Sequence, residues 1–229
     1  MVGNGADREV RAVFHSLDSA VNPLPHFAAM KQSVVTLDLE GVLVPEIWIA
    51  VAEKTGIAEL RLTTRDEPDY DLLMTNRINI LDQHKLKLAD IQEVIGTLHP
   101  LDGAREFMAA LRERTQVIIL SDTFEEFAQP LMRQLDWPTI LCHRLVIENG
   151  RIVNYKLRQS DQKRKAVAAL KALDYQVISA GDSFNDTTML AEAHHGFLFH
   201  APEAIKKQFP QFPALEEYND LLARITKLL

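Results

Sequence analysis

The first candidate for chemistry is a pair of carboxylates separated by one residue. Asp38 and Glu40 directly follow a short apolar run, residues 33–37, and Gly41 comes next. Two carboxylates in unlike environments can divide a reaction between them, one as nucleophile and the other as general acid and base. Glycine gives the backbone freedom to turn sharply after the pair. The segment therefore predicts a reactive loop at the end of a strand.

Polar residues follow two later apolar runs in the same way. Ser121 and Asp122 come after the first of these runs, and Asp182, Asn185 and Asp186 come after the second. In a parallel sheet such strand ends lie at one edge, where ligands bind. Carboxylate, carbonyl and water oxygens suit Mg²⁺, and a serine hydroxyl at the start of a helix suits phosphate oxygens. A lysine is then needed to neutralise charge between the nucleophile and the phosphate.

The elements that must position these residues alternate between strand and helix. Short continuous apolar runs predict strands at 33–38, 116–121, 176–181 and 196–200, and amphipathic segments predict helices at 102–114, 123–135 and 161–173. Apolar strands separated by such helices indicate a parallel sheet covered on both faces, a Rossmann-like α/β fold. Residues 144–156 predict a hairpin around Asn149-Gly150, because both central residues of its turn need positive φ. A last helix is expected within 215–229.

The segment after the first strand interrupts this alternation. It contains three helical stretches, at 47–54, 70–81 and 88–97, and no buried strand. We therefore expect a helical cap at 45–98 over a catalytic core formed by 33–44 and 99–229. Residues 1–32 are expected to be a poorly ordered extension outside the core.

The composition excludes several classes of protein. The net charge of −7 argues against general nucleic-acid binding, which requires clustered basic residues. We expect no membrane span, because no stretch approaches the ~20 apolar residues that one needs. A single cysteine, Cys142, excludes an intramolecular disulfide, and with no secretory signal it predicts a cytoplasmic protein. The sequence carries no signal for an oligomeric state.

Four segments carry the candidate residues: Asp38-Leu-Glu40-Gly-Val42, Leu120-Ser121-Asp122-Thr123, the lysine of Asp161-Gln-Lys163-Arg164, and Gly181-Asp182-Ser-Phe-Asn185-Asp186. In this order they resemble the four motifs of the haloacid-dehalogenase-like phosphotransferases, and the helical insert resembles the cap of the phosphoserine phosphatase branch. Residues 38–49, 63–66, 121–124 and 131–135 are more closely similar to the bifunctional phosphoserine phosphatase and phosphoserine:homoserine phosphotransferase group. The resemblance covers 33–213.

The resemblance implies a magnesium-dependent phosphoserine phosphatase of amino-acid biosynthesis, with homoserine as a second phosphoryl acceptor to be tested. It implies that Asp38 attacks phosphorus and that Glu40 protonates the leaving oxygen and then activates the acceptor. The implied metal ligands are Asp38, the Glu40 backbone carbonyl and Asp182. The implied substrate ligands are Ser121, Asp122, Lys163 and Asn185, joined from the cap by Glu46 and Arg77, whose charges would complement the ammonium and carboxylate of phosphoserine.

Two points stay open among the site residues. Lys163, Arg164 and Lys165 are neighbours; the earliest position in the helix and the spacing of the group favour Lys163 for phosphate. Glu40 stands where most of the superfamily has aspartate, and its extra methylene moves the carboxylate.

Other interpretations remain beside these. Asp186 is expected to support the site, Trp48 and Trp137 to lie in the core, and the histidines to have surface or packing roles. A phosphatase for another small phosphomonoester is the main alternative, because this superfamily changes substrate through the cap. A non-catalytic protein on the same fold is the third.

Overall fold

Seven strands form one sheet in the order β4-β3-β2-β1-β5-β6-β7. The computed structural model describes residues 31–63, 66–67 and 69–229. All neighbouring strands are parallel except β3 and β4, which form an antiparallel hairpin. The strands are β1 (Ser33–Leu37), β2 (Gln116–Phe124), β3 (Thr139–Glu148), β4 (Arg151–Lys156), β5 (Gln176–Gly181), β6 (His195–Phe199) and β7 (Ala214–Leu215). The Rossmann-like α/β prediction is confirmed.

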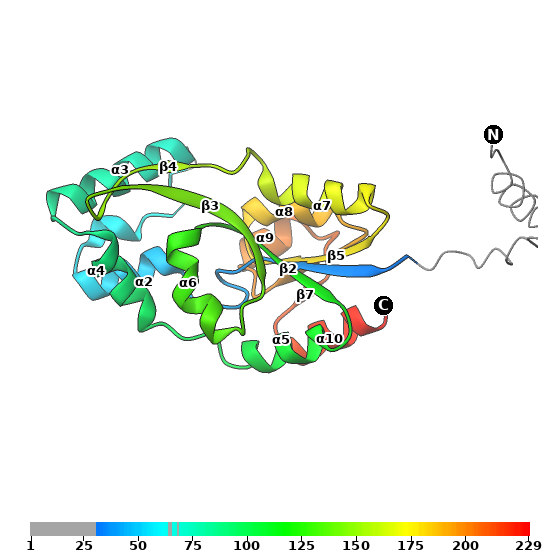
Figure 1. The fold of residues 1–229 in the computed structure, drawn as a ribbon. Helices are drawn as coiled ribbons and strands as arrows, with labels where there is room; N and C mark the ends of the chain where they lie inside the picture. The colour runs from blue at the N-terminus through cyan, green and yellow to red at the C-terminus, as the bar shows by residue number, and fades with distance from the viewer. Residues whose placement is uncertain (1–30, 64–65, 68) are drawn as a thin grey trace, which may run out of the picture. The chain divides into compact units, whose positions relative to one another are not determined.

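Helices cover both faces of the sheet (Figure 1). Side chains alternate along β1, so Val34 packs toward α7 and α8 while Val35 packs toward α5, α6 and α10. Both clusters are buried, which explains why the central strands have continuous apolar sequences. The helices of the core are α5 (Ala104–Arg112), α6 (Glu125–Gln134), α7 (Gln162–Ala172), α8 (Thr187–Glu192), α9 (Glu203–Gln208) and α10 (Tyr218–Thr226), with the 3₁₀ helix η2 (Phe184–Asp186).

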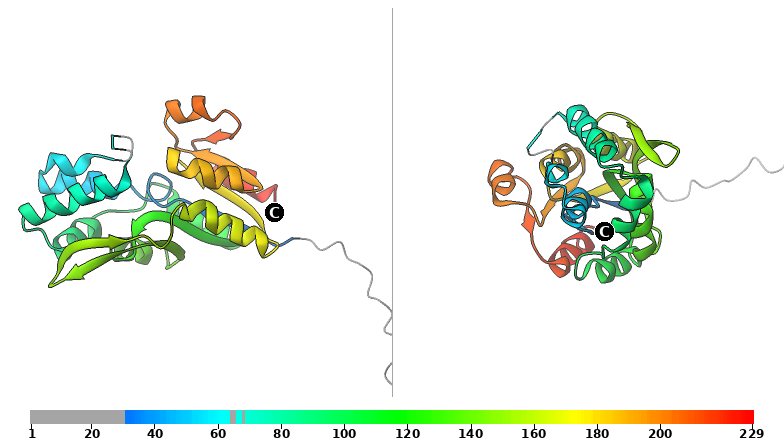
Figure 2. Two further views of the ribbon diagram at one scale, coloured as in Figure 1. Left: turned by 90° about the horizontal axis from the view of Figure 1, so that it is seen from above. Right: turned by 90° about the vertical axis from the view of Figure 1, so that its left-hand side faces the viewer.

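The insert between β1 and β2 contains α2 (Ile47–Thr55), the 3₁₀ helix η1 (Ala58–Arg61), α3 (Tyr70–Gln83) and α4 (Leu88–Gly96). Figures 1 and 2 show these helices gathered at the end of the sheet where the β3–β4 hairpin extends beside them. The backbone N–H of Leu88 donates to the carbonyl of Gly150 in the hairpin turn at 2.9 Å, and Arg151 pairs with Asp82. The insert is therefore held to the core by these contacts with the β3–β4 hairpin, as well as by the two segments of chain that connect it to β1 and β2.

The hairpin turn is where the sequence indicates it, because Asn149 and Gly150 both have positive φ, 50° and 79°. One boundary was wrong: the helix expected from Thr123 begins at Glu125, because β2 continues to Phe124 past an irregularity in its pairing with β3. The short β7 and α9 were not predicted.

Residues 32–229 form one compact unit, so the cap boundaries 45 and 98 stay a prediction. Residues 1–30 of the expected extension, 1–32, and residues 64 and 65 of the 63–66 segment lie outside the described residues.

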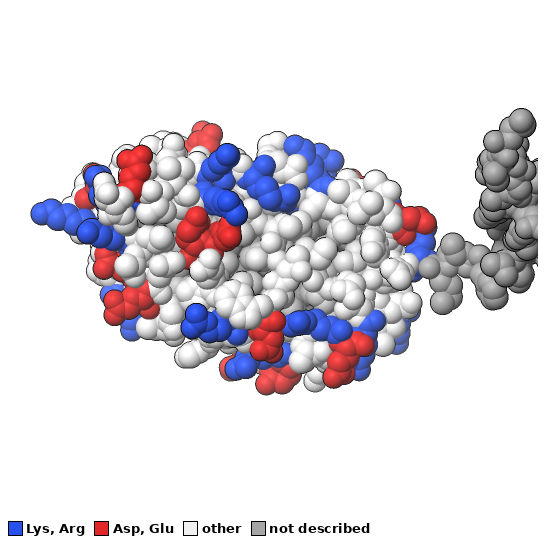
Figure 3. Space-filling model, in the orientation of Figure 1, with Lys and Arg blue, Asp and Glu red and all other residues white. Residues whose placement is uncertain are grey.

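Charged side chains of both signs are mixed on the face drawn in Figure 3, with an uncharged area between them. This face therefore offers no continuous basic surface of the kind that nucleic-acid binding requires. No described helix is both long enough and apolar enough to cross a bilayer.

Candidate active site

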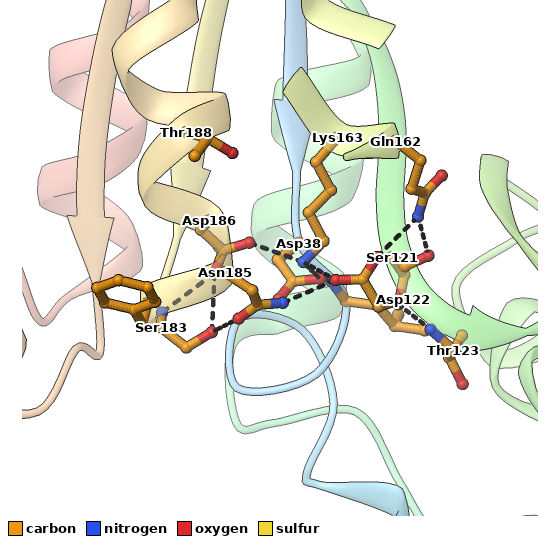
Figure 4. Close-up of polar contacts among 12 residues, drawn as sticks. Asp38, Ser121, Asp122, Thr123, Gln162, Lys163, Ser183, Asn185, Asp186 and Thr188 are labelled. Carbon is orange, nitrogen blue, oxygen red and sulfur yellow. Dashed lines mark hydrogen bonds and ion pairs between the residues drawn. The ribbon is translucent and has the colours of Figure 1, made fainter. Parts of the chain in front are cut away.

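The site is built around Asp38, which follows the last residue of β1. Its backbone N–H donates to the Ala180 carbonyl of β5 at 3.0 Å, so the end of the central strand is held in the sheet. The side chain is buried, and its Oδ1 accepts from the N–H of Leu39 at 2.7 Å and from Lys163 Nζ at 2.9 Å. The carboxylate therefore occupies one fixed position at the sheet edge (Figure 4).

Lys163 connects three carboxylates that come from three different strand ends. Its Nζ lies 2.7 Å from Asp186 Oδ1, 2.9 Å from Asp38 Oδ1 and 3.7 Å from Asp122 Oδ2. Burial disfavours the charge, but these carboxylates raise the pKa of Lys163 well above its ordinary value. The ammonium is therefore charged at neutral pH.

The two neighbouring basic residues lie elsewhere. Arg164 pairs with Asp161 and Glu192, and Lys165 donates to Ser160 Oγ at 2.9 Å. Of the three candidates, only Lys163 is in the cluster around Asp38.

Three buried aspartates, Asp38, Asp182 and Asp186, bring carboxylate oxygens within 4.8 Å of one another. Asp186 uses Oδ1 for Lys163, and its Oδ2 accepts from the backbone N–H groups of Asp182 at 3.0 Å and Ser183 at 3.1 Å. Asp186 therefore connects Lys163 to the backbone of the segment after β5, which is a supporting role of the kind expected from the sequence.

The donor set fits a divalent cation. Burial and the nearby Asp186 raise the pKa of Asp38 well above its usual value, and Lys163 reverses only part of this shift. Three aspartates with one lysine leave a net negative site, and oxygen-only ligands of this kind are those that Mg²⁺ prefers. The packing is also tight, because a Cβ on Gly41 would lie 2.5 Å from the Asp182 carboxylate.

Ser121 and Asp122 form the opposite side of the site. Ser121 is buried within β2, and its Oγ accepts from the Thr123 N–H at 3.2 Å. Asp122 accepts from Asn185 Nδ2 at 2.8 Å and from Gln162 Nε2 at 3.2 Å. Although burial opposes ionisation, Lys163 and these donors hold the pKa of Asp122 well below its usual range.

Two residues at this side were not found from the sequence, His143 and Gln162. His143 Nδ1 accepts from the Arg158 N–H at 3.1 Å, which leaves the proton on Nε2, 3.5 Å from Asp122 Oδ1. Gln162 donates both to Asp122 and to the Ser121 carbonyl. His143 is buried and its ring lies against Phe124, in keeping with the expected packing role, but β3 also places it beside Asp122 at the end of β2, which its position in the sequence did not indicate. Gln162 had one available signal, its position next to Lys163.

The remaining predicted residues line the same cavity, of about 770 Å³, from the insert side. Glu40 Oε2 accepts from the N–H of Ile47 at 2.9 Å, at the first turn of α2. Burial and the nearby Glu46 raise the pKa of Glu40 to about 7, against the effects of the Ile47 N–H and of Arg77. Glu40 can therefore gain and lose a proton near neutral pH, as a general acid and base must.

Arg77 reaches the cavity from α3. It is buried, its Nη2 donates to the Leu62 carbonyl at 2.6 Å, and burial lowers the pKa of the guanidinium to about 10, so it stays cationic at neutral pH. The ring of Trp48 lies 4.5 Å from its Cζ. Trp48 is buried as expected but also lines the cavity. For Trp137 the expected core position was wrong: it is 60% exposed, on the turn that follows α6.

All nine predicted site residues thus line one cavity, Asp38, Glu40, Glu46, Arg77, Ser121, Asp122, Lys163, Asp182 and Asn185. Hydrogen bonds and ion pairs connect Asp38, Lys163, Asp122 and Asn185, and Asp182 joins this cluster through Asp186. Glu40, Glu46 and Arg77 lie on the other wall, where Glu40 accepts from Ile47 and Arg77 donates to Leu62.

Comparison with known proteins agrees with this arrangement. A family model described as haloacid dehalogenase-like hydrolase matches residues 32–194. The chain is 65% identical to "Phosphoserine phosphatase ThrH" of Pseudomonas aeruginosa over 85% of this chain and 95% of that protein. It is 64% identical to "Phosphoserine phosphatase" of Pseudomonas syringae pv. tomato over 85% and 82%.

Among solved structures, the fold is similar to "Phospho-Aspartyl Intermediate Analogue of Phosphoserine phosphatase", with a TM-score of 0.68 at 17% identity, covering 85% of this chain and 99% of that one. At this identity the similarity establishes the fold alone. The match to the family model and the two relatives in Pseudomonas establish the family. The chain belongs to the haloacid dehalogenase-like hydrolases, in the group that contains these Pseudomonas phosphoserine phosphatases.

Proposed function

We propose that this chain is a phosphoserine phosphatase that works through a phosphorylated Asp38. The observation that carries the proposal is the meeting of Asp38, Lys163 and Asp182 at one sheet edge, inside a cavity that Glu40 and Arg77 also line. Phosphoserine is proposed as the substrate because both Pseudomonas relatives are named phosphoserine phosphatases.

In the first step an Asp38 oxygen attacks phosphorus, and the bond between phosphorus and the serine oxygen breaks. Glu40 gives its proton to that oxygen, so serine leaves as a neutral alcohol. In the second step Glu40 takes a proton from water, whose oxygen attacks phosphorus. The bond to Asp38 then breaks, releasing phosphate and restoring both carboxyl groups. A Glu40 pKa of about 7 suits both directions of proton transfer.

The proposed Mg²⁺ ligands are the carboxylates of Asp38 and Asp182 and the backbone carbonyl of Glu40, with Asp186 supporting Asp182 through its hydrogen bond to the backbone. When bound, the ion supplies positive charge to the phosphoryl oxygens. Lys163 contributes charge at the same point, because its Nζ contacts Asp38 directly.

Ser121, Asp122 and Asn185 are proposed to position the phosphoryl group. The hydrogen bond between Asn185 and Asp122 connects the segment after β5 to the end of β2 across the site. On the insert wall, Glu46 is proposed to bind the ammonium of phosphoserine and Arg77 its carboxylate, with 45–98 acting as the cap. These two residues are the natural source of amino-acid selectivity, since neither contacts the strand-end cluster.

Homoserine is proposed as a second acceptor, which would take the place of water and transfer its hydroxyl proton to Glu40. We propose a cytoplasmic location, which the absence of a second cysteine supports.

The test is phosphate release from a panel of phosphomonoesters, with and without homoserine, following inorganic phosphate and phosphohomoserine together. Preference for O-phospho-L-serine supports the proposal. Equal rates across the panel would favour a phosphatase for another metabolite, and no release from any member would leave only a binding role.

A further inference from the structure

Arg77 is a buried cation that forms no ion pair with any residue that the structure describes. No carboxylate in the described residues lies within ion-pair distance of it, although Glu40 and Glu46 are near enough to affect its pKa. Its Nη2 donates to the Leu62 carbonyl, its Nη1 donates to the Met74 sulfur at 3.7 Å, and its Nε is buried with no hydrogen-bond partner in the part of the chain that the structure describes. A buried donor without a partner is costly unless a ligand satisfies it.

The face of Trp48 takes the place of the missing counter-ion. The guanidinium carbon lies 4.5 Å from the ring centroid, a cation–π geometry. Trp48 is in turn held edge-on by Phe127 of α6, with ring centroids 5.5 Å apart and planes at 70°. An aromatic face stabilises a cation without neutralising it, so Arg77 keeps its full charge for an anionic ligand, whereas a glutamate in the same place would compete with that ligand.

We infer that Trp48 is a positioning residue for recognition of the substrate carboxylate. It fixes the plane of Arg77 through the cation–π contact, while the Nη groups, which donate to the neutral Leu62 carbonyl and the Met74 sulfur, keep their positive charge for a carboxylate. The inference rests on the proposed function, in which Arg77 binds the carboxylate of phosphoserine. It assigns to Trp48 a role in selectivity and none in the chemistry at phosphorus.

Two substrates separate this role from simple packing. O-phospho-L-serine and phosphoethanolamine share the phosphate and the ammonium, but only the first has a carboxylate. In Trp48→Leu the ratio of their kcat/KM values should fall about 5- to 30-fold, the range expected for losing a cation–π contact. The fall should come from a higher KM for phosphoserine. The kcat for phosphoserine, and both kcat and KM for phosphoethanolamine, should stay within about 2-fold of the wild-type values.

The variants form a matched set. Trp48→Phe keeps an aromatic face and should retain most of the ratio. Arg77→Ala should lower the ratio at least as far, and Trp48→Leu added to Arg77→Ala should lower it no further. Trp137→Leu, at an exposed tryptophan outside the cavity, should leave it unchanged. An equal fall for both substrates in Trp48→Leu, or a further fall in the double variant, would overturn the inference.

A binding measurement keeps the inference testable if Trp48→Leu does not fold or if the wild type hydrolyses neither substrate. In Trp137→Phe the only remaining tryptophan is Trp48. O-phospho-L-serine should change its fluorescence, and phosphoethanolamine at the same concentration should not. No change with phosphoserine, or the same change with both, contradicts the role of Trp48. Absence of hydrolysis in the wild type contradicts only the proposed function.

Discussion

Replacing Lys163 by methionine would remove the one ammonium that the structure places among the buried aspartates. Methionine is unbranched like lysine and one heavy atom shorter, so the loss is mainly that of the charged ammonium group. Two carboxylates, of Asp186 and Asp38, lie within 2.9 Å of the Lys163 ammonium, and the Asp122 carboxylate lies at 3.7 Å. Each of the close pairs is worth about 6 kcal/mol of Coulomb energy at an effective dielectric constant of about 20, before desolvation is subtracted.

Removing one partner from a buried ion pair costs about 3–5 kcal/mol, because the other partner is left buried without compensation. We expect Lys163→Met to lower the free energy of unfolding by this amount in metal-free buffer at pH 8. The loss should be smaller at pH 5, because carboxyls whose pKa is raised in the folded state take up protons there and no longer repel one another. The double variant Lys163→Met/Asp186→Asn should recover part of the loss.

The measurement is urea unfolding in EDTA at the two pH values. Lys165→Met is the matched control: its Nζ contacts only the Ser160 hydroxyl in the structure, so its cost should stay within about 0.5 kcal/mol. If Lys163→Met is as stable as Lys165→Met, or if its loss is the same at both pH values, the electrostatic account of the cluster is wrong.

Further predictions concern the acid–base residue and the cation. The pKa of Glu40 is about 7 in the folded state, whereas in an unfolded chain it is about 4.5. The folded state therefore holds the proton more tightly, and the free energy of unfolding falls by about 3 kcal/mol as the pH rises from 4.5 to 7. Glu40→Gln should therefore melt at a higher temperature than wild type at pH 8 and lose this advantage at pH 4.5, as calorimetry in EDTA can measure; an equal difference at both pH values would refute the assignment. Gly41→Ala should raise the Mg²⁺ concentration for half-maximal activity at least about tenfold, because its Cβ would lie 2.5 Å from the Asp182 carboxylate. Gly56→Ala is the control and should leave this concentration unchanged, because Gly56 also has a positive φ but has open space around it. Equal effects of the two substitutions would mean that backbone strain alone is responsible. EDTA should abolish phosphate release and Mg²⁺ should restore it, and activity that survives chelation would contradict the proposed metal site.

The strand-end residues were predictable because local sequence determines them. Each follows an apolar run that is long enough for one buried strand, and parallel pairing then brings Asp38, Ser121 and Asp182 to one edge. The hairpin was equally predictable from the sequence, since Asn149-Gly150 is a turn signal between two β-rich runs. These features depend on spacing and backbone preference, which a single sequence contains.

The contacts across the cavity were not predictable in this way. His143 and Trp48 belong to elements whose positions relative to Asp122 and Arg77 follow from packing, and neither stands in a recognisable spacing. The end of β2 was misplaced because residues 121–124 stay extended before α6, against the helical expectation. Trp137 shows the converse, since an apolar side chain on a turn stays exposed when no element covers it.

The most direct test of the account is to identify the residue that carries the phosphoryl group during turnover. The enzyme would be mixed with Mg²⁺ and phosphoserine, quenched in acid within the first turnovers, digested and analysed by mass spectrometry, with Asp38→Asn as the control. We predict a phosphorylated peptide whose modified residue is Asp38, absent from the Asp38→Asn variant. A phosphoryl group on Ser121 or another side chain, or turnover near the wild-type rate in Asp38→Asn, would contradict the central role of Asp38.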